Sequence, residues 1–170
     1  MGSEMCIRDS FKTIALADVI DVVQDIYADV AEDADMVLSK NIVSANNQQP
    51  LSIRGDKELL VQMLANLVEN AIRYCAAGTK ITISAREIRD AMNGNSIELS
   101  VADTGVGIPA EECELVFQRL YRLDKSRSDG QGTGLGLSLV KAIVELHDAN
   151  IELQDNTPGL RVMMWFPLQD

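Results

Sequence analysis

Residues 130–140 read GQGTGLGLSLV, a glycine-rich loop that turns directly into an apolar run of helical character. Glycine lets the backbone approach a ligand closely, and a helix N-terminus directs free N–H groups and a positive dipole end toward an anion. The stretch therefore predicts a loop that binds phosphate. It is not a Walker A loop, because Gly136 is followed by Leu137, and then Ser138, whereas that motif requires a lysine directly after the glycine.

The composition is that of one acidic globular domain. Of the 170 residues, 46% are hydrophobic and 24% are charged, which suffices for a single core. The net charge of −11 repels phosphate backbones and anionic lipids, so we expect no nucleic-acid partner and no direct membrane contact. The apolar runs are too short to span a bilayer. Local dipoles and a metal ion must therefore offset this charge wherever an anion binds.

The cysteines and the N-terminal stretch bear on compartment and domain limits. Cys6, Cys75 and Cys113 form no C-x-x-C pair, so the sequence predicts reduced thiols in the cytoplasm and neither a disulfide framework nor a zinc site. Residues 1–10, MGSEMCIRDS, lack the layout of a signal peptide and are interpreted as a leader or a sequence artefact outside the fold. The expected domain comprises residues 11–170.

Hydrophobic periodicity predicts an α+β fold. The apolar spacing indicates four helices, at about 15–36, 57–75, 110–123 and 135–147. Alternating runs indicate six strands, at 36–43, 51–56, 79–87, 95–103, 149–156 and 160–168. Asp56 stands at the N-cap position of the second helix, and strands 79–87 and 95–103 should pair antiparallel. We expect a two-layer α/β sandwich in which the three main helices cover one face of a mixed sheet.

The stretch NLVENAIRY places two amides on one helical face. Asn66 and Asn70 lie four residues apart, inside a helix otherwise committed to the core. They are either solvated or capping amides, or ligands whose carbonyl oxygens face a cleft and hold Mg²⁺ shared with substrate phosphates. Arg73 and Tyr74, one turn further on, would then reach those phosphates.

The stretch VADTGVGIP ends a strand with an acidic residue and opens a tight glycine turn. Its match to the dinucleotide fingerprint is weak, because the polar stretch DKSRSDG stands where a second parallel strand should begin. Asp103 either caps a structural turn or accepts a hydrogen bond from an exocyclic amino group of a flat ring. The glycines of the turn would let that ring lie against backbone.

Taken together, NLVENAIRY, DTGVGIP, FQRLYR and GQGTGLGL resemble, in this order, the N, G1, F and G2 boxes of bacterial sensor histidine kinases. The resemblance covers about residues 11–170 and implies the Bergerat ATP-binding fold of the gyrase, chaperone and histidine-kinase superfamily. It implies ATP and Mg²⁺ as ligands. The activity it implies is transfer of the γ-phosphoryl group to a histidine on a separate dimerisation domain, within two-component signal transduction.

The resemblance also assigns roles by position. Asn70 would hold Mg²⁺ with Asn66 beside it, and Asp103 would bind the adenine amino group. Asn66, Asn70 and Arg73 would form the catalytic set, with Tyr74 near the phosphates. The remaining positions would shape the pocket, the loop over the triphosphate and the lid, and they are Gly105, Gly107, Ile108, Phe117, Arg119, Tyr121, Arg122, Lys125, Arg127, Gly132, Thr133, Gly134, Leu135, Gly136 and Leu137.

Other classes share this resemblance. Gyrase-type and chaperone ATPases carry a water-activating Glu where Asn66 stands, and an amide is no general base. An anti-sigma-factor-type serine kinase and a catalytically silent nucleotide-binding module remain alternatives. His147, the one histidine of the chain, is not taken as the phosphoryl acceptor, since the acceptor motif of the family lies upstream in another domain.

These assignments imply partners and a location. The partners would be the dimerisation and histidine-phosphotransfer domain of the same parent protein and, indirectly, a response regulator. The fragment itself is expected to be monomeric and to form the cytoplasmic portion of an inner-membrane sensor.

Overall fold

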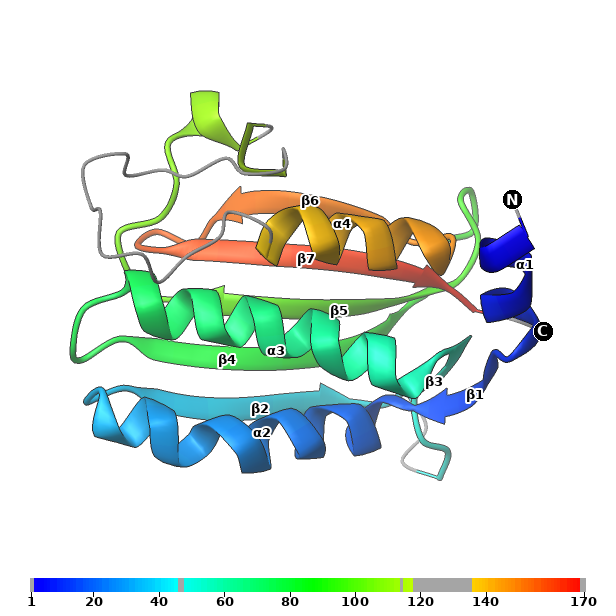
Figure 1. Cartoon of the computed structure of the whole chain (residues 1–170), viewed down its shortest axis with the longest axis horizontal. Coiled ribbons are helices and arrows are strands. Elements are labelled where there is room, and N and C mark those ends of the chain that lie inside the picture. Colours follow the sequence, from blue (N-terminus) through cyan, green and yellow to red (C-terminus); the bar gives the residue numbers. More distant parts are fainter. Residues whose placement is uncertain (1, 46–47, 114, 118–135, 169–170) are drawn as a thin grey trace.

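The structure is a computed structural model that describes residues 2–45, 48–113, 115–117 and 136–168 (Figure 1). Its helices are α1 (Gly2–Asp9), α2 (Leu16–Asp33), α3 (Lys57–Tyr74) and α4 (Gly136–Leu146). Its strands are β1 (Lys12–Ala15), β2 (Val37–Val43), β3 (Ser52–Gly55), β4 (Lys80–Ile88), β5 (Ser96–Asp103), β6 (Asn150–Asp155) and β7 (Leu160–Pro167). Two short 3₁₀ turns, η1 (Ala110–Glu112) and η2 (Leu115–Phe117), lie between β5 and α4.

The main sheet has five strands in the order β2-β4-β5-β7-β6. The strands β2 and β4 are parallel, whereas β4 with β5, β5 with β7 and β6 with β7 are antiparallel. The sheet is therefore mixed, as the sequence predicted. A second ladder, β1 with β3, stands apart from it at one end of the molecule (Figure 1).

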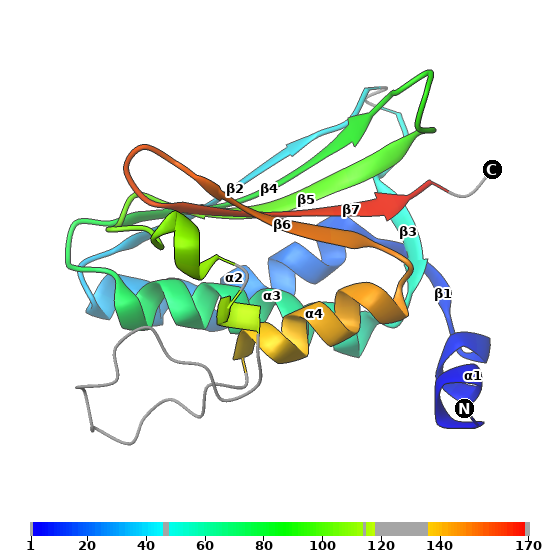
Figure 2. The ribbon, with the colours of Figure 1, turned by 90° about the horizontal axis from the view of Figure 1, so that it is seen from above.

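The helices α2, α3 and α4 all lie against the same face of this sheet, so the molecule has two layers (Figure 2). The alternation of strand residues explains which face they cover. Ile81, Ile83, Leu99 and Met164 point toward the helices and are fully buried. The opposite face carries polar side chains, among them Glu98, whose carboxylate binds Arg86 in a bidentate pair and Arg161. The expected α+β sandwich is confirmed.

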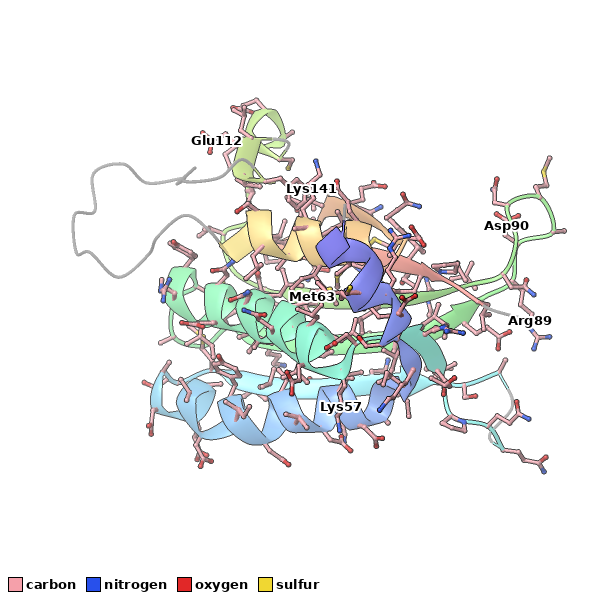
Figure 3. The ribbon with its side chains drawn as sticks, turned by 45° about the vertical axis from the view of Figure 1, so that its right-hand side comes forward. Lys57, Met63, Arg89, Asp90, Glu112 and Lys141 are labelled. Atoms are coloured by element: carbon pink, nitrogen blue, oxygen red, sulfur yellow. The ribbon has the colours of Figure 1, made fainter. Side chains whose placement is uncertain are left out.

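The central helix α3 is the best defined by its sequence. The carboxylate of Asp56 accepts a hydrogen bond from the Leu59 N–H at 3.0 Å, which confirms the predicted N-cap. Met63 points into the space between the layers and is fully buried, while Lys57 lies on the outside of the helix (Figure 3). The rest of its apolar stripe, apart from the partly exposed Leu59, is buried as expected.

Three features of the local structure differ from what the sequence pattern indicates. The described part of 110–123 was expected to be a helix but forms two 3₁₀ turns, and its one buried residue is Val116. In α2 the apolar residues Ile26 and Val30 are about half exposed, at 53% and 46%, because this helix covers an edge strand and has a neighbouring helix on one side. The four-residue strand β1 was not predicted, since so short a run shows no clear period.

Residues 2–9, which the sequence placed in a leader, form the helix α1. Arg8 donates to Asp148 at 3.1 Å, and the Phe11 ring stacks on His147 at 4.6 Å between centroids.

Among the described residues, no helix is both long and apolar enough to cross a membrane.

His147 joins the end of α4 to the start of α3. Its Nε2 accepts from the Asp56 N–H at 3.1 Å, so the ring proton sits on Nδ1 and donates to the Ile143 carbonyl at 2.8 Å. The ring is 4% exposed, and a Cβ at Gly55 would lie 2.6 Å from it. Both ring nitrogens therefore make hydrogen bonds within the fold, which agrees with the view that His147 is not a phosphoryl acceptor.

The burial of His147 makes stability depend on pH. Desolvation lowers the pKa of His147, against the opposing hydrogen bond to Ile143 and the charge of Asp56, while Arg8 lowers it further and Asp148 raises it. The unfolded chain binds this proton near pH 6.5 and the folded chain does not, so stability falls as pH drops through that value. We expect the free energy of unfolding, measured with urea, to decrease between pH 7.5 and pH 5.5. In His147→Gln this decrease should shrink markedly, and an unchanged decrease would assign the effect to other groups.

Candidate functional site

A cavity of about 420 Å³ opens between the C-terminal half of α3, the end of β5 and the start of α4. Its walls are largely apolar, and the described residues that line it are Leu67, Asn70, Ala71, Tyr74, Cys75, Val101, Asp103, Val106, Gly107, Ile108, Pro109, Glu112, Leu137, Leu160 and Val162. The labelled Glu112 marks this end of the molecule in Figure 3, whereas Arg89 and Asp90 lie at the opposite end of the sheet. Its size and lining suit a flat, mostly apolar organic group.

Asp103 is the fixed polar group of this cavity. It is 8% exposed, and its Oδ1 accepts from the Gly105 N–H at 2.9 Å and from the Leu160 N–H at 3.2 Å. Its main-chain carbonyl accepts from the Asn156 side-chain amide at 2.7 Å. A carboxylate held by several donors is preorganised to accept from a ligand N–H group, because little freedom remains to be lost on binding.

The turn after β6 presses against Asp103 without a side chain between them. A Cβ at Gly159, where φ is +114°, would lie 1.9 Å from the Asp103 carbonyl oxygen. A Cβ at Gly107, where φ is +75°, would lie 2.8 Å from the Gly159 carbonyl oxygen. Both positions therefore need glycine for conformation and for space. The predicted turn after Asp103 and the turn at 157–159 thus form one backbone-to-backbone contact.

The charges of the cavity indicate which part of a ligand enters it. Asp103 and Glu112 are acidic, and no described residue in the lining is Lys, Arg or His. An anionic group deep in this cavity would meet two carboxylates without a cation, which is unfavourable. A neutral ring bearing an amino group fits the cavity, and any phosphates attached to it are expected to extend toward its mouth.

Asn70 and the start of α4 meet at the cavity. A Cβ at Gly136 would lie 3.3 Å from Asn70 Nδ2 and 3.4 Å from its Oδ1, so the first residue of α4 faces the Asn70 amide closely. The start of this 11-residue helix and the amide of Asn70 therefore lie side by side. This arrangement suits a phosphate shared with a metal ion.

The donor set near Asn70 limits which metal fits. Among the described residues, no group of three His, Cys, Asp or Glu side chains is placed to hold a metal ion. An ion held by one amide carbonyl must take its other ligands from phosphate oxygens and water. Mg²⁺ binds in this way, since it keeps several waters and shares itself with substrate phosphates.

Two predicted residues lie away from the cavity lining. Asn66 buries its Nδ2 without a hydrogen-bond partner among the described residues. The Arg73 guanidinium pairs with the Glu69 carboxylate at 3.1 Å, and Glu69 also accepts from the Tyr27 hydroxyl at 3.4 Å. Arg73 is thus held by an ion pair within α3, and the Glu69 carboxylate is engaged by Arg73 and Tyr27.

The other predicted positions divide into two groups. Asn70, Tyr74, Asp103, Gly107, Ile108 and Leu137 line the cavity, and Gly105 and Gly136 abut it through Asp103 and Asn70. A second group lies outside the described residues and stays a prediction: Arg119, Tyr121, Arg122, Lys125, Arg127, Gly132, Thr133, Gly134 and Leu135. Phe117 is described, and the Lys141 ammonium lies 5.7 Å from the centre of its ring.

Sequence reasoning missed the residues that support Asp103 from other elements. Cys75 follows the NLVENAIRY stretch directly and lines the cavity. Asn156 was assigned to the end of the strand 149–156, and Gly159 to a simple turn between two strands. The signal available was the glycine in that turn, but its partner lies more than fifty residues away and periodicity carries no such information.

Comparisons with known proteins agree with this geometry. Residues 55–170 match the family model described as histidine kinase-, DNA gyrase B- and HSP90-like ATPase. The sensor-like histidine kinase SenX3 of Mycolicibacterium smegmatis is 41% identical over 137 residues, which are 72% of this chain and 34% of SenX3. The sensor protein kinase PmrB of Pseudomonas aeruginosa is 36% identical over 146 residues, which are 85% of this chain and 29% of PmrB.

Solved structures show the same fold. The nucleotide-free catalytic domain of histidine kinase ThkA superposes with a TM-score of 0.78 at 24% identity, covering 93% of this chain and 95% of that one. The mycobacterial sensor histidine kinase MprB gives a TM-score of 0.71 at 23% identity, covering 92% and 97%. The chain spans about a third of the length of SenX3 and less of PmrB.

The contact of Gly159 with Asp103 can be tested by stability. Gly159→Ala should lower the free energy of unfolding by at least about 3 kcal/mol, because the new Cβ combines left-handed strain with a clash against backbone. Gly94→Ala is the matched control, since Gly94 also has a positive φ of +86° but nothing within 4 Å of the added Cβ. That variant should lose about 1 kcal/mol. Equal losses in urea unfolding would show that conformation alone, and not the contact, requires Gly159.

Proposed function

This chain belongs to the family of histidine kinase-, DNA gyrase B- and HSP90-like ATPases, and we propose that it binds Mg²⁺–ATP and donates the γ-phosphoryl group to a histidine on a separate dimerisation domain. Its relatives are sensor histidine kinases, so it is the ATP-binding catalytic domain of a kinase of that kind. The observation that supports the proposal most strongly is one cavity lined by both Asp103 and Asn70.

The proposed pose places adenine in the apolar part of the cavity. The Asp103 carboxylate accepts a hydrogen bond from the exocyclic amino group, and apolar side chains such as Leu67 and Val162 pack against the ring. Guanine carries a carbonyl oxygen at the same place, which would face the carboxylate without a donor. The site should therefore prefer ATP to GTP.

The triphosphate then runs toward Asn70 and the start of α4. Asn70 would hold Mg²⁺ through its side-chain carbonyl, and the ion would neutralise charge on the phosphates. Gly136 leaves room for the phosphates beside Asn70, at the start of α4, where the helix dipole favours an anion. Phosphoryl transfer depends mostly on such positioning and charge neutralisation, which does not require a nucleophile from this chain.

The described residues near Asn70 favour transfer over hydrolysis. Asn66 is an amide and cannot activate water, and the carboxylate of Glu69 is engaged by Arg73 and Tyr27. A serine kinase or a silent nucleotide-binding module would share the same cavity. Acceptor chemistry distinguishes these alternatives, as described below.

The proposal extends to partners and location. The catalytic domain would act on the dimerisation and histidine-phosphotransfer domain of its own parent, which would pass the phosphoryl group to a response regulator. By itself it would be monomeric, and in the cell it would be the cytoplasmic portion of an inner-membrane sensor. Its relatives support this, since they are named as sensor kinases and the matched segment makes up only 34% of SenX3 and 29% of PmrB.

Two substitutions should separate base binding from metal binding. Asp103→Asn should weaken adenosine and Mg²⁺–ATP alike, by roughly ten- to a hundred-fold, because a hydrogen bond to a charged group is lost. Asn70→Ala should weaken Mg²⁺–ATP and leave adenosine within about two-fold of the unmodified chain, since it removes a metal ligand. Calorimetric titration of both ligands measures this. Loss of adenosine binding in Asn70→Ala would remove Asn70 from the metal site.

The acceptor class can be tested with γ-labelled ATP. Alone, the chain should neither label itself nor hydrolyse ATP appreciably. Addition of the parent's dimerisation domain as a separate protein should produce label on that domain, slowly, because association costs entropy that a tethered domain avoids. The label should be acid-labile, as a phosphoramidate is. Acid-stable label would favour the serine kinase, and no transfer with intact ATP binding would favour the silent module.

A further inference from the structure

Cys75 occupies a wall of the cavity that the assignments above leave unused. It follows the last residue of α3, where its N–H donates to the Ala71 carbonyl at 3.0 Å, and its side chain is half-buried. It lines the cavity together with Asp103. The end of α3 and the end of β5 therefore bring a thiol and a carboxylate to the same place.

Gly105 lies close to both the thiol and the carboxylate. A Cβ at Gly105 would lie 2.5 Å from Cys75 Sγ and 3.1 Å from Asp103 Oδ1. The thiol thus occupies the space that any side chain at position 105 would need. The glycine at position 105 is required so that the sulfur can sit beside the carboxylate, in addition to any contact that a ligand makes with the turn.

The environment of Cys75 keeps its proton in place. Burial, the negative charge of Asp103 and a hydrogen bond to Asp103 raise the pKa of the Cys75 thiol to about 12, against a hydrogen bond with Thr79 that lowers it. At neutral pH the group is therefore a neutral S–H donor and not a reactive thiolate. A neutral donor can orient the carboxylate and leave its negative charge in place. An ammonium group at the same position would neutralise that charge.

We propose that Cys75 is a positioning residue for adenine recognition, whose S–H group orients the Asp103 carboxylate toward the exocyclic amino group of the base. The assignment rests on the proposed binding of adenine at Asp103. The backbone donors from Gly105 and Leu160 hold Oδ1. In this proposal the thiol, which lies against the same glycine, adds a donor from the side of α3. Without the thiol, the carboxylate gains freedom that adenine must remove on binding.

A purely structural role for Cys75 makes a different prediction. If the sulfur only fills space, its removal loosens the wall and weakens every purine nucleoside equally. If it acts through Asp103, its removal weakens ligands that bear the amino group and spares those that lack it. Adenosine and purine riboside, which differ by that amino group, distinguish the two roles.

Calorimetric titration of both nucleosides tests the assignment. Cys75→Ala should weaken adenosine about three- to ten-fold, the usual loss for one hydrogen bond, and leave purine riboside within about two-fold. Cys75→Ser, which keeps a donor, should bind both nucleosides within about two-fold of the unmodified chain. Cys6→Ala is the matched control, because Cys6 is exposed and does not line the cavity. If Cys75→Ala does not fold, Cys75→Val replaces it, since it fills the space and also lacks a donor.

A double-mutant cycle completes the test. In an Asp103→Asn background, Cys75→Ala should cause no further loss of adenosine affinity, because the two residues act through one contact. Equal weakening of both nucleosides by Cys75→Ala, or an undiminished loss in the Asp103→Asn background, would overturn the assignment. An unmodified chain that binds neither nucleoside would instead refute the proposed function, on which the assignment depends.

Discussion

The close approach of Gly159 to the carbonyl of Asp103 is the constraint on which the cavity depends. Because β5 pairs with β7, the turn after β6 lies beside the end of β5. Asn156 in that turn and Leu160 at the start of β7 both donate to Asp103. The acidic side chain is thereby fixed at the end of β5.

Features of the chain that recur with a short period could be predicted from sequence. The stripe on α3, the cap at Asp56 and the alternation in β4 and β5 all depend on neighbours within a few residues. Asn70 and Asp103 were identified because a polar residue beside an apolar run is conspicuous. Their supports, Cys75 and Gly159, come from distant parts of the chain, and the exposure of Ile26 depends on which strand lies beneath α2.

The distribution of charge explains how an acidic chain can take an anionic ligand. Several described cations are committed to acidic partners: Arg73 to Glu69, Arg86 and Arg161 to Glu98, and Arg89 to Glu87. These ion pairs neutralise opposite charges on the surface but place no positive charge in the cavity lining. Within the described residues, a metal ion and the start of α4 are therefore the expected sources of affinity for a triphosphate, which makes binding sensitive to the concentration of divalent cations. The predicted cations Lys125 and Arg127 lie outside the described residues.

The hydrogen bond from Asp56 to His147 joins the N-terminal end of α3 to the C-terminal end of α4. The cavity lies at the other end of this helix pair, where Gly136 faces Asn70. The contact that makes stability depend on pH and the residues that line the cavity are therefore separated by the length of the helices. Protonation of His147 thus acts on the joint between the two helices and not on the lining of the cavity.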